Sequence, residues 1–372
     1  MNVENWGNSP VPFLPGQVLS ERFYHQTVRS LIGRFFSGLP YTAALVGYGS
    51  DVLGFDTPRS RDHMWGPRLV LFLAPDQADQ TAPALDEIFR RDLPAAFLGY
   101  PTNFSAPDRD NVRTMAFVEQ GPVNHLIHIT TIPEFIRQEL GINLADPLDA
   151  RVWLSLPQQK LLAVTGGAVY HDDLNFAAVR AQFNFYPHDV WLYTLACQWA
   201  RIAQEEAFVG RAGEAGDELG SRIIAARLVR DLMRLAFLLE RRYAPYSKWF
   251  GTAFQKLTLA PLLQPVFDSA LGAADWQTRA RHLAQAYEAL AHRQNQLDIT
   301  EPITVQTRPF FNRPFRVLFA GRFSEALQAN IRDPWLQRLP LYGAIDQVSS
   351  NSEVLEDPSA WERLRFLYPS AG

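Results

Sequence analysis

Several features that are common in other proteins are scarce or absent in this chain of 372 residues. The single cysteine, Cys197, has no partner for an internal disulfide, and its aliphatic and aromatic neighbours predict a small core residue. No apolar run approaches the roughly 18 residues that a membrane-spanning helix needs. The start of the chain has neither the basic nor the apolar region of a signal peptide. These absences predict a soluble protein of a reducing compartment, most simply the cytoplasm.

An excess of basic charge is also missing. The net charge is −4 at pH 7, and the pI is about 6.1. We therefore expect neither nucleic acid nor an anionic membrane as a partner, because both bind basic surfaces. The hydrophobic fraction of 47% is ample for a packed core, and the length allows one large domain or two of ordinary size.

The first part of the chain, residues 1–186, alternates helical and extended apolar patterns. This alternation predicts an α+β domain with a mixed sheet. The predicted helices are 17–36, 76–97, 133–140 and 158–164, and the predicted strands are 43–46, 69–73, 112–118, 123–131 and 168–173.

The second part, residues 187–372, is helical in pattern and predicts an all-α domain with an irregular C-terminal tail. Asp217 is the expected N-cap of the second helix, and residues 210–216 are an expected glycine-rich connector. The tail is expected to hold a strand at 315–319 and a helix at 324–331. The predicted helices before the tail are 188–208, 218–243, 248–259, 261–271 and 275–297.

The segment from residue 45 to residue 73 is the most informative about function. It joins two predicted strands through a turn that contains Gly47, Gly49 and Ser50. A glycine at the end of a strand lets a phosphate approach the backbone N–H groups, and a serine adds a hydroxyl donor. We therefore predict that Gly49 and Ser50 bind phosphate, with Arg68 as a further ligand.

Three carboxylates, Asp51, Asp56 and Asp62, follow this turn. Mg²⁺ prefers hard oxygen ligands and usually takes only one or two from protein. Nucleotidyl transfer by metal ions needs a bridging carboxylate and normally two or three carboxylates in all. We predict that Mg²⁺ is held chiefly by Asp62, that Asp51 or Asp56 completes the metal site, and that Asp62 and Asp51 are the catalytic acids.

At this point the sequence resembles the signature of the nucleotidyltransferase superfamily, which is Gly-Ser, a spacer of about ten residues, and then acid-x-acid. Gly49-Ser50 and Asp62 match that pattern. More closely, the chain resembles the bacterial family called domain of unknown function 4037. This resemblance implies a nucleotidyltransferase-like domain with a helical partner, but no established substrate. The strings that carry it occupy residues 47–56, 60–68, 216–221, 227–235 and 243–249.

The sequence also departs from the superfamily pattern. Met64 stands where the second acid is expected, and a thioether is a poor ligand for Mg²⁺. A third acid is expected on a later strand, but the segment 123–131 has only Asn124, His125 and His128 as polar side chains of ligand type.

Three function classes therefore stay open. The first is an enzyme that transfers a nucleotidyl group from a nucleoside triphosphate to a small molecule or a protein, with Mg²⁺ as cofactor. The second is a protein on the same fold that binds a nucleotide or another ligand without turnover. The third is an interaction protein whose helical domain is the working surface.

Basic residues of the helical part provide a second candidate set. Arg227, Arg230 and Arg234 lie on one face of the second predicted helix, whose other faces are apolar. A buried unpaired charge costs several kcal/mol, so these arginines need partners. In one interpretation they bind the triphosphate across a cleft between the domains, together with Lys248. In the other they pair with acidic groups such as Asp231.

Overall fold

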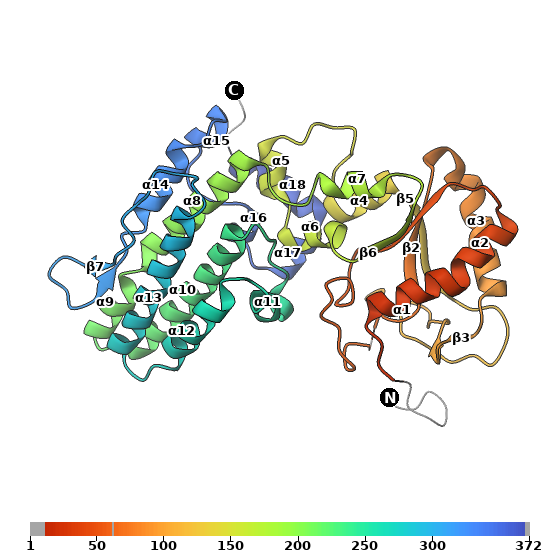
Figure 1. The fold of residues 1–372 in the computed structure, drawn as a ribbon, viewed down its shortest axis with the longest axis horizontal. Helices are drawn as coiled ribbons and strands as arrows, with labels where there is room; N and C mark the ends of the chain where they lie inside the picture. The colour runs from red at the N-terminus through yellow and green to blue at the C-terminus, as the bar shows by residue number, and fades with distance from the viewer. Residues whose placement is uncertain (1–11, 62, 369–372) are drawn as a thin grey trace. The chain divides into compact units, whose positions relative to one another are not determined.

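The structure is a computed structural model, and it describes residues 12–61 and 63–368. The chain folds into two compact units, which we treat separately (Figure 1). Unit 1 comprises residues 1–147 and 160–184, and unit 2 comprises residues 148–159 and 185–372. The segment 148–159, which we expected in the first domain, thus packs in unit 2.

Unit 1 contains a four-stranded sheet, a two-stranded hairpin and helices on both faces of the sheet (Figure 1). The sheet consists of β1 (Tyr41–Leu45), β2 (Arg68–Leu73), β5 (Leu126–Thr131) and β6 (Ala168–Asp172). The hairpin consists of β3 (Ala96–Phe97) and β4 (Tyr100–Pro101). The helices are α1 (Gly16–Phe23), α2 (Arg29–Phe35), α3 (Pro75–Asp92), α4 (Ile132–Leu140), α6 (Gln158–Thr165) and α7 (Phe176–Ala181), and a π-helical segment (Tyr24–Val28) joins α1 to α2.

The order of strands in the sheet is β5-β2-β1-β6. β1 runs antiparallel to β2 and to β6, whereas β2 runs parallel to β5. The sheet is therefore mixed, and the predicted α+β fold is confirmed. Because β1 and β2 are antiparallel neighbours, the end of β1 and the start of β2 lie at the same end of the sheet. The loop 46–67 connects them there.

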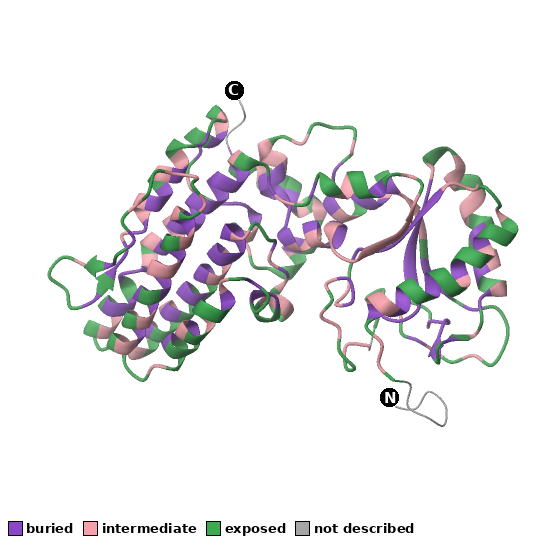
Figure 2. Cartoon of the chain, in the orientation of Figure 1, coloured by how far each residue is buried: buried purple, intermediate pink, exposed green. Residues whose placement is uncertain are grey.

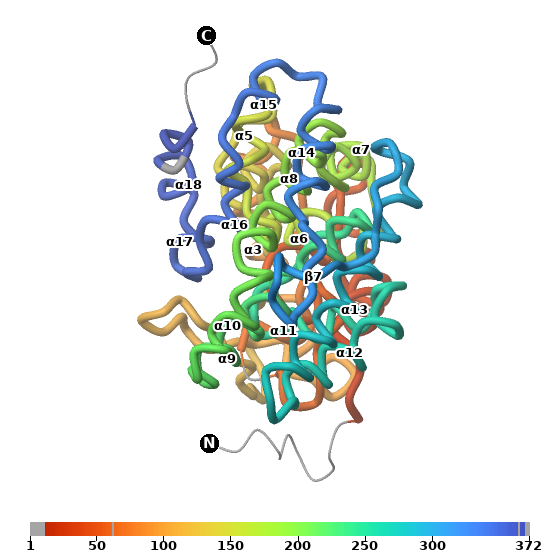
Figure 3. The backbone as a smooth tube through the Cα atoms, turned by 90° about the vertical axis from the view of Figure 1, so that its left-hand side faces the viewer, coloured from red at the N-terminus to blue at the C-terminus, as the bar shows by residue number. Residues whose placement is uncertain are grey.

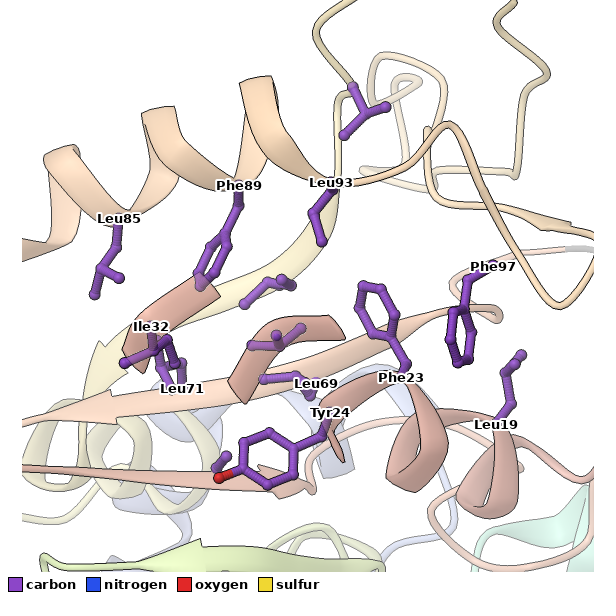
Figure 4. Close-up of a cluster of buried hydrophobic side chains, with 14 of the residues drawn as sticks. Leu19, Phe23, Tyr24, Ile32, Leu69, Leu71, Leu85, Phe89, Leu93 and Phe97 are labelled. Atoms are coloured by element: carbon purple, nitrogen blue, oxygen red, sulfur yellow. The ribbon is translucent and has the colours of Figure 1, made fainter. Parts of the chain in front are cut away.

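One face of the sheet packs against α1, the π-helical segment and α3 (Figure 4). Leu85, Phe89 and Leu93 follow one another at four-residue spacing and point from α3 toward the sheet. They meet Leu69 and Leu71, which alternate along β2. Full burial of each such side chain stabilises the fold by roughly 1.5–3 kcal/mol.

The opposite face of the sheet packs against α4 and α7. The ring of Phe72 lies 5.3 Å from that of Phe135 on α4 and 4.6 Å from that of Phe176 on α7. Since successive strand residues face opposite sides, β2 is covered on both faces. All residues of β1 and β2 are accordingly buried (Figure 2), and this explains why their sequences are continuous apolar runs.

Unit 2 is built mainly of helices. In the described part of the whole chain, no helix combines the length and the apolar character that crossing a membrane requires. Unit 2 also has a short hairpin, β7 (Arg308–Pro309) and β8 (Arg316–Val317). Its helices are α5 (Ala150–Ser155), α8 (His188–Glu205), α9 (Phe208–Glu214), α10 (Glu218–Leu239), α11 (Ser247–Phe254), α12 (Ala260–Gly272), α13 (Trp276–Asn295), α14 (Gly321–Ala329), α15 (Pro334–Arg338), α16 (Ile345–Val348), α17 (Ser352–Glu356), α18 (Pro358–Leu364) and a final 3-10 turn (Arg365–Leu367).

The helix α8 lies in the core of unit 2. Its Trp191 indole donates a buried hydrogen bond of 2.8 Å to the Leu238 carbonyl of α10. On another side α14 runs beside it (Figures 1 and 3), and Ser324 Oγ donates to the Ala196 carbonyl at 2.7 Å. Cys197 is buried on the same helix, and burial raises the pKa of its thiol to about 12. The interpretation of Cys197 as a core residue is confirmed.

Two predictions for unit 1 were wrong. Residues 112–118 do not form a strand and contribute only an isolated bridge between Phe104 and Met115. There the side chain of Asn103 makes hydrogen bonds that the backbone of a neighbouring strand would otherwise make. Asn103 Oδ1 accepts from the Asn124 N–H, and Asn103 Nδ2 donates to the Ala116 carbonyl. The helix predicted to reach residue 97 ends at Asp92, because the following Leu93 precedes a proline and is extended.

The prediction of a glycine-rich connector at 210–216 is also wrong, because most of this segment belongs to the helix α9. Its glycines serve close packing. A Cβ at Gly210 would overlap the ring of Phe315, and a Cβ at Gly213 would overlap Trp276. The absence of side chains at these two positions lets the aromatic rings lie directly on the helix.

The C-terminal tail is more ordered than expected. It holds four short helices, α15 to α18, and side chains cap three of them: Asp333, Asn351 and Asp357 accept hydrogen bonds from first-turn N–H groups. The strand predicted at 315–319 is shorter in the structure, where β8 comprises only Arg316–Val317. Asp217 caps α10 by accepting from the Gly220 N–H at 2.8 Å, which confirms that prediction.

The close approach of Gly167 to β1 yields a stability prediction. Gly167 has φ 69°, and a Cβ there would overlap the Leu45 carbonyl. We expect Gly167→Ala to lower the free energy of unfolding by at least about 2 kcal/mol, through backbone strain and steric overlap. The matched control is Gly33→Ala in α2, where a Cβ meets nothing within 4 Å. That change is expected to be neutral or stabilising. Equal losses in urea unfolding of the two variants would contradict this account.

Candidate functional site

The glycine turn, residues 47–50, leaves the end of β1. The Gly47 N–H donates to the Ala163 carbonyl of α6 at 2.8 Å, which anchors the start of the turn. Gly49 has φ 141°, and a Cβ at this position would overlap Asp51 Oδ1 and lie 2.6 Å from Arg68 Nη2. Only glycine therefore fits at position 49.

Asp51 and Arg68 form a buried ion pair beneath the glycine turn. Arg68 Nη2 donates to Asp51 Oδ1 at 2.7 Å, and Arg68 Nε donates to Asp51 Oδ2 at 3.0 Å. The residues are only 1% and 8% exposed, respectively. Arg68 Nη2 also donates to the Tyr48 carbonyl at 2.9 Å, and the Val52 N–H donates to Asp51 Oδ1 at 3.0 Å. We expected a metal ligand and a phosphate ligand here, and the structure instead pairs the two residues with each other.

Asp56 links the loop 51–67 to the start of α1 through a hydrogen bond. Its Oδ2 accepts from the Gly16 N–H at 2.7 Å and from the Trp65 indole N–H at 2.9 Å. Trp65 is itself buried, with its ring 5.4 Å from that of Tyr100. Asp56 is thus engaged in holding the loop 51–67 against the body of unit 1.

The two described carboxylates of the predicted magnesium site are engaged by N–H donors of the protein. Mg²⁺ requires oxygen lone pairs that face it with near-octahedral geometry. Both oxygens of Asp51 accept N–H donors from the protein, and so does Oδ2 of Asp56. Within residues 12–61 and 63–368, no three His, Cys, Asp or Glu side chains gather closely enough to hold a metal. Asp62 lies outside the described residues, so its predicted roles as metal ligand and catalytic acid stay predictions.

Met64 adopts a left-handed backbone conformation, with φ 49°. Its N–H donates to the Arg113 carbonyl at 2.8 Å. Outside glycine, this conformation is most common for Asn and Asp, because their short polar side chains bond locally. The backbone at position 64 therefore suits the acid that the superfamily pattern expects there.

The third expected acid is not replaced by the polar residues next to β5 and within it. Asn124 Nδ2 donates to the Phe104 carbonyl at 2.9 Å. His125 is buried, its Nδ1 accepts from the Ile127 N–H at 3.2 Å, and its Nε2 lies 3.3 Å from Asp86 Oδ1. Burial lowers the pKa of His125, which keeps the imidazole neutral. Asn124 and His125 therefore serve the structure of unit 1.

The backbone of the glycine turn offers hydrogen-bond donors. The N–H groups of Gly49, Ser50 and Asp51 have no partner among the residues that the structure describes. Ser50 is half-buried and adds its hydroxyl beside them. Consecutive N–H groups in a glycine-containing turn form a concave donor set that suits an anion.

A second ion pair near the turn was missed by the sequence analysis. Lys160 Nζ on α6 lies 2.9 Å from Glu139 Oε2 on α4, and the two side chains are only 12% and 17% exposed. The other oxygen, Glu139 Oε1, lies 3.6 Å from the position of a Cβ at Gly47. Only the scarcity of lysine, with three in the chain, could have drawn attention to Lys160.

The basic residues of unit 2 have different surroundings from one another. Arg227 on α10 is exposed and pairs with Glu205 on α8 at 2.7 Å. Arg230 on the same helix and Lys248 on α11 are exposed. The Lys248 ammonium lies 5.1 Å from the centre of the Trp249 ring. Of these residues, Arg230 and Lys248 are the most open to a ligand.

Arg234 is held inside unit 2 by the C-terminal segment. Its Nη1 donates to the Asp346 carbonyl, and burial lowers the pKa of its guanidinium. Asp231 is buried beside it, but its carboxylate accepts from Arg201 Nε on α8 at 3.3 Å. Arg227 thus pairs with an acidic group, as in the structural interpretation, whereas Arg234 donates to a backbone carbonyl.

Comparison with known proteins identifies part of this architecture. Residues 153–250 match the family model described as Domain of unknown function (DUF4037). The chain is similar to this family over that segment. The segment begins in α5 and ends in α11, so it includes α10 with its arginines. The family resemblance predicted from the sequence is thereby confirmed.

One solved structure is similar to the chain over most of its length. It is the crystal structure of a nucleotidyltransferase-like protein from Exiguobacterium sibiricum 255-15 at 1.90 Å resolution. The identity is 11%, the TM-score is 0.32, and the similarity covers 92% of this chain and 89% of that chain. No curated protein sequence matches the chain. The similarity to the DUF4037 family model concerns residues 153–250.

Burial of the Asp51–Arg68 pair leads to a prediction with a matched control. Asp51→Ala leaves a buried guanidinium unpaired, and we expect the free energy of unfolding to fall by about 3–5 kcal/mol. The pair Arg91–Asp92 has the same two-bond geometry, at 2.7 and 3.1 Å, but lies on the surface. Asp92→Ala should change stability little. Chemical denaturation of both variants checks this, and similar losses would refute the role of burial.

The carboxyl of Asp346 makes stability depend on pH. Burial raises its pKa above the ordinary value, and Arg234 and the Gln158 N–H offset this only in part. Between the ordinary and the raised pKa, the folded state binds more protons than the unfolded state, so stability falls as pH rises through that window. Asp346→Asn should remove this fall, whereas Asp268→Asn, at an exposed aspartate of α12, should keep it. Unfolding curves at successive pH values from 4 upward test the difference.

Proposed function

We propose that the chain binds the phosphates of a nucleoside triphosphate at the glycine turn, as a nucleotidyltransferase-like protein. The observation that carries this proposal is the set of N–H groups at Gly49, Ser50 and Asp51, which have no partner within the described residues. They are held in place by the buried Asp51–Arg68 pair, so the donors are positioned before a ligand arrives. Such preorganisation reduces the entropy cost of binding.

Exposed basic residues supply the charge that a triphosphate needs. We include Arg227, Arg230, Arg234 and Lys248 in the proposed phosphate-binding set. The side chains of Arg230 and Lys248 are exposed on unit 2. Arg227 would have to leave Glu205, and Arg234 would have to leave the Asp346 carbonyl. We therefore expect Arg230 and Lys248 to contribute most.

Transfer of the nucleotidyl group to a small-molecule or protein acceptor is the second candidate function. What favours it is the spacing of Gly49-Ser50 from Asp62, together with the family resemblance. Since Asp51 and Asp56 accept N–H donors from the protein, any Mg²⁺ would depend on Asp62. Binding without turnover needs no such metal site and agrees better with the geometry of the described residues.

The direct test is isothermal titration calorimetry with ATP and with GTP, in the presence of Mg²⁺ and again with EDTA. We expect binding that survives EDTA, because the turn binds through N–H groups. Ser50→Ala should weaken it about two- to tenfold through the loss of one hydroxyl donor. Ser269→Ala, at an exposed serine of α12, is the control and should have no effect.

Three outcomes separate the candidates. Absence of binding to either triphosphate refutes the proposal. Binding that EDTA or Asp62→Ala abolishes favours the metal-dependent transfer reaction, which release of pyrophosphate in the presence of candidate acceptors would then establish. Binding that is indifferent to Ser50→Ala would place the ligand elsewhere on the molecule.

A further inference from the structure

The ion pair of Lys160 and Glu139 lies beside the glycine turn and joins α6 to α4. Three contacts place it there. Lys160 Nζ lies 2.9 Å from Glu139 Oε2, and Glu139 Oε1 lies 3.6 Å from the Cβ position of Gly47. One turn further along α6, the Ala163 carbonyl accepts from the Gly47 N–H at 2.8 Å. The helix that carries the lysine is therefore bonded directly to the turn.

Stability alone is a weak explanation for this pair. The two side chains are only 12% and 17% exposed, so both charges have lost most of their water. A buried ion pair usually contributes little net stability relative to apolar residues of the same size. A charge pair in this position is therefore better explained by an interaction that uses the charge.

The two basic groups beside the turn differ in side-chain chemistry. Arg68 donates to both oxygens of Asp51 and to the Tyr48 carbonyl, so its guanidinium is fixed by three hydrogen bonds. Lys160 has a flexible stem and an ammonium with three N–H donors. Such a side chain can direct its donors to an anion without a shift of the backbone.

We propose that Lys160 is a phosphate-binding residue of the glycine turn, and that Glu139 holds it there until a phosphate ligand takes the place of the carboxylate. This inference rests on the proposed function and adds a specific cationic partner to it. The turn then offers neutral N–H donors on one side and a positive charge on the other. That combination selects a multiply charged anion, such as a triphosphate, over a nucleoside.

Two variants test the proposal with opposite expected effects. Glu139→Gln removes the competing carboxylate and should tighten the binding of Mg·ATP or Mg·GTP several-fold. The double variant Glu139→Gln with Lys160→Met removes both charges, keeps similar side-chain sizes, and should weaken binding about tenfold to a hundredfold. If the pair were merely structural, both variants would weaken binding or leave it unchanged.

The control is Lys256→Met, which removes an exposed lysine of unit 2 and should leave the affinity unchanged. Titration calorimetry gives the affinities, and thermal unfolding without ligand shows that each variant is folded. Failure of the unaltered protein to bind either triphosphate overturns the proposed function, and this inference with it. Binding by the unaltered protein that the double variant retains in full overturns the inference alone.

Discussion

The buried ion pair between Asp51 and Arg68 is the interaction on which the candidate site depends. It joins the residue that follows the glycine turn to the first residue of β2, and so brings the two ends of a long loop together. It excludes any side chain from position 49, because a Cβ there would overlap the carboxylate. It also engages both carboxylate oxygens of Asp51 with the Arg68 guanidinium. One pair thus shapes the turn and limits its chemistry.

Several described charged groups near the turn already have a partner. Asp56 accepts from two N–H donors, and Lys160 lies against Glu139. The electric fields of two opposite charges that form a pair largely cancel at a distance. Among the described residues, the electric field at the turn therefore comes mainly from the backbone N–H groups. Under the proposed function, oriented backbone dipoles would bind the anion first and the charged side chains would act only at close contact.

The parts of the fold that the sequence predicted well are those set by local pattern. The runs 43–46 and 69–73 became β1 and β2 because each is covered on both faces, and Leu85 and Phe89 gave α3 its apolar stripe. The errors came from distant partners. No residue close to 112–118 in the sequence indicates that the side chain of Asn103 would hydrogen-bond to the backbone of this segment. Likewise, the pairing of Asp51 with Arg68, rather than with a ligand, depends on how β1 and β2 are aligned.

The glycines of α9 have a consequence for how this protein can be divided or extended. A run with three glycines between two long helices resembles a hinge, and such runs are usual places for inserting tags, cutting a chain or permuting its ends. Here the ring of Phe315 packs directly on Gly210, and that of Trp276 packs directly on Gly213. Both aromatic residues come from segments far along the chain. An insertion at this point would separate helix from ring and open the core of unit 2. The tolerant positions of this chain must therefore be sought in its exposed loops, and not where glycine is most frequent.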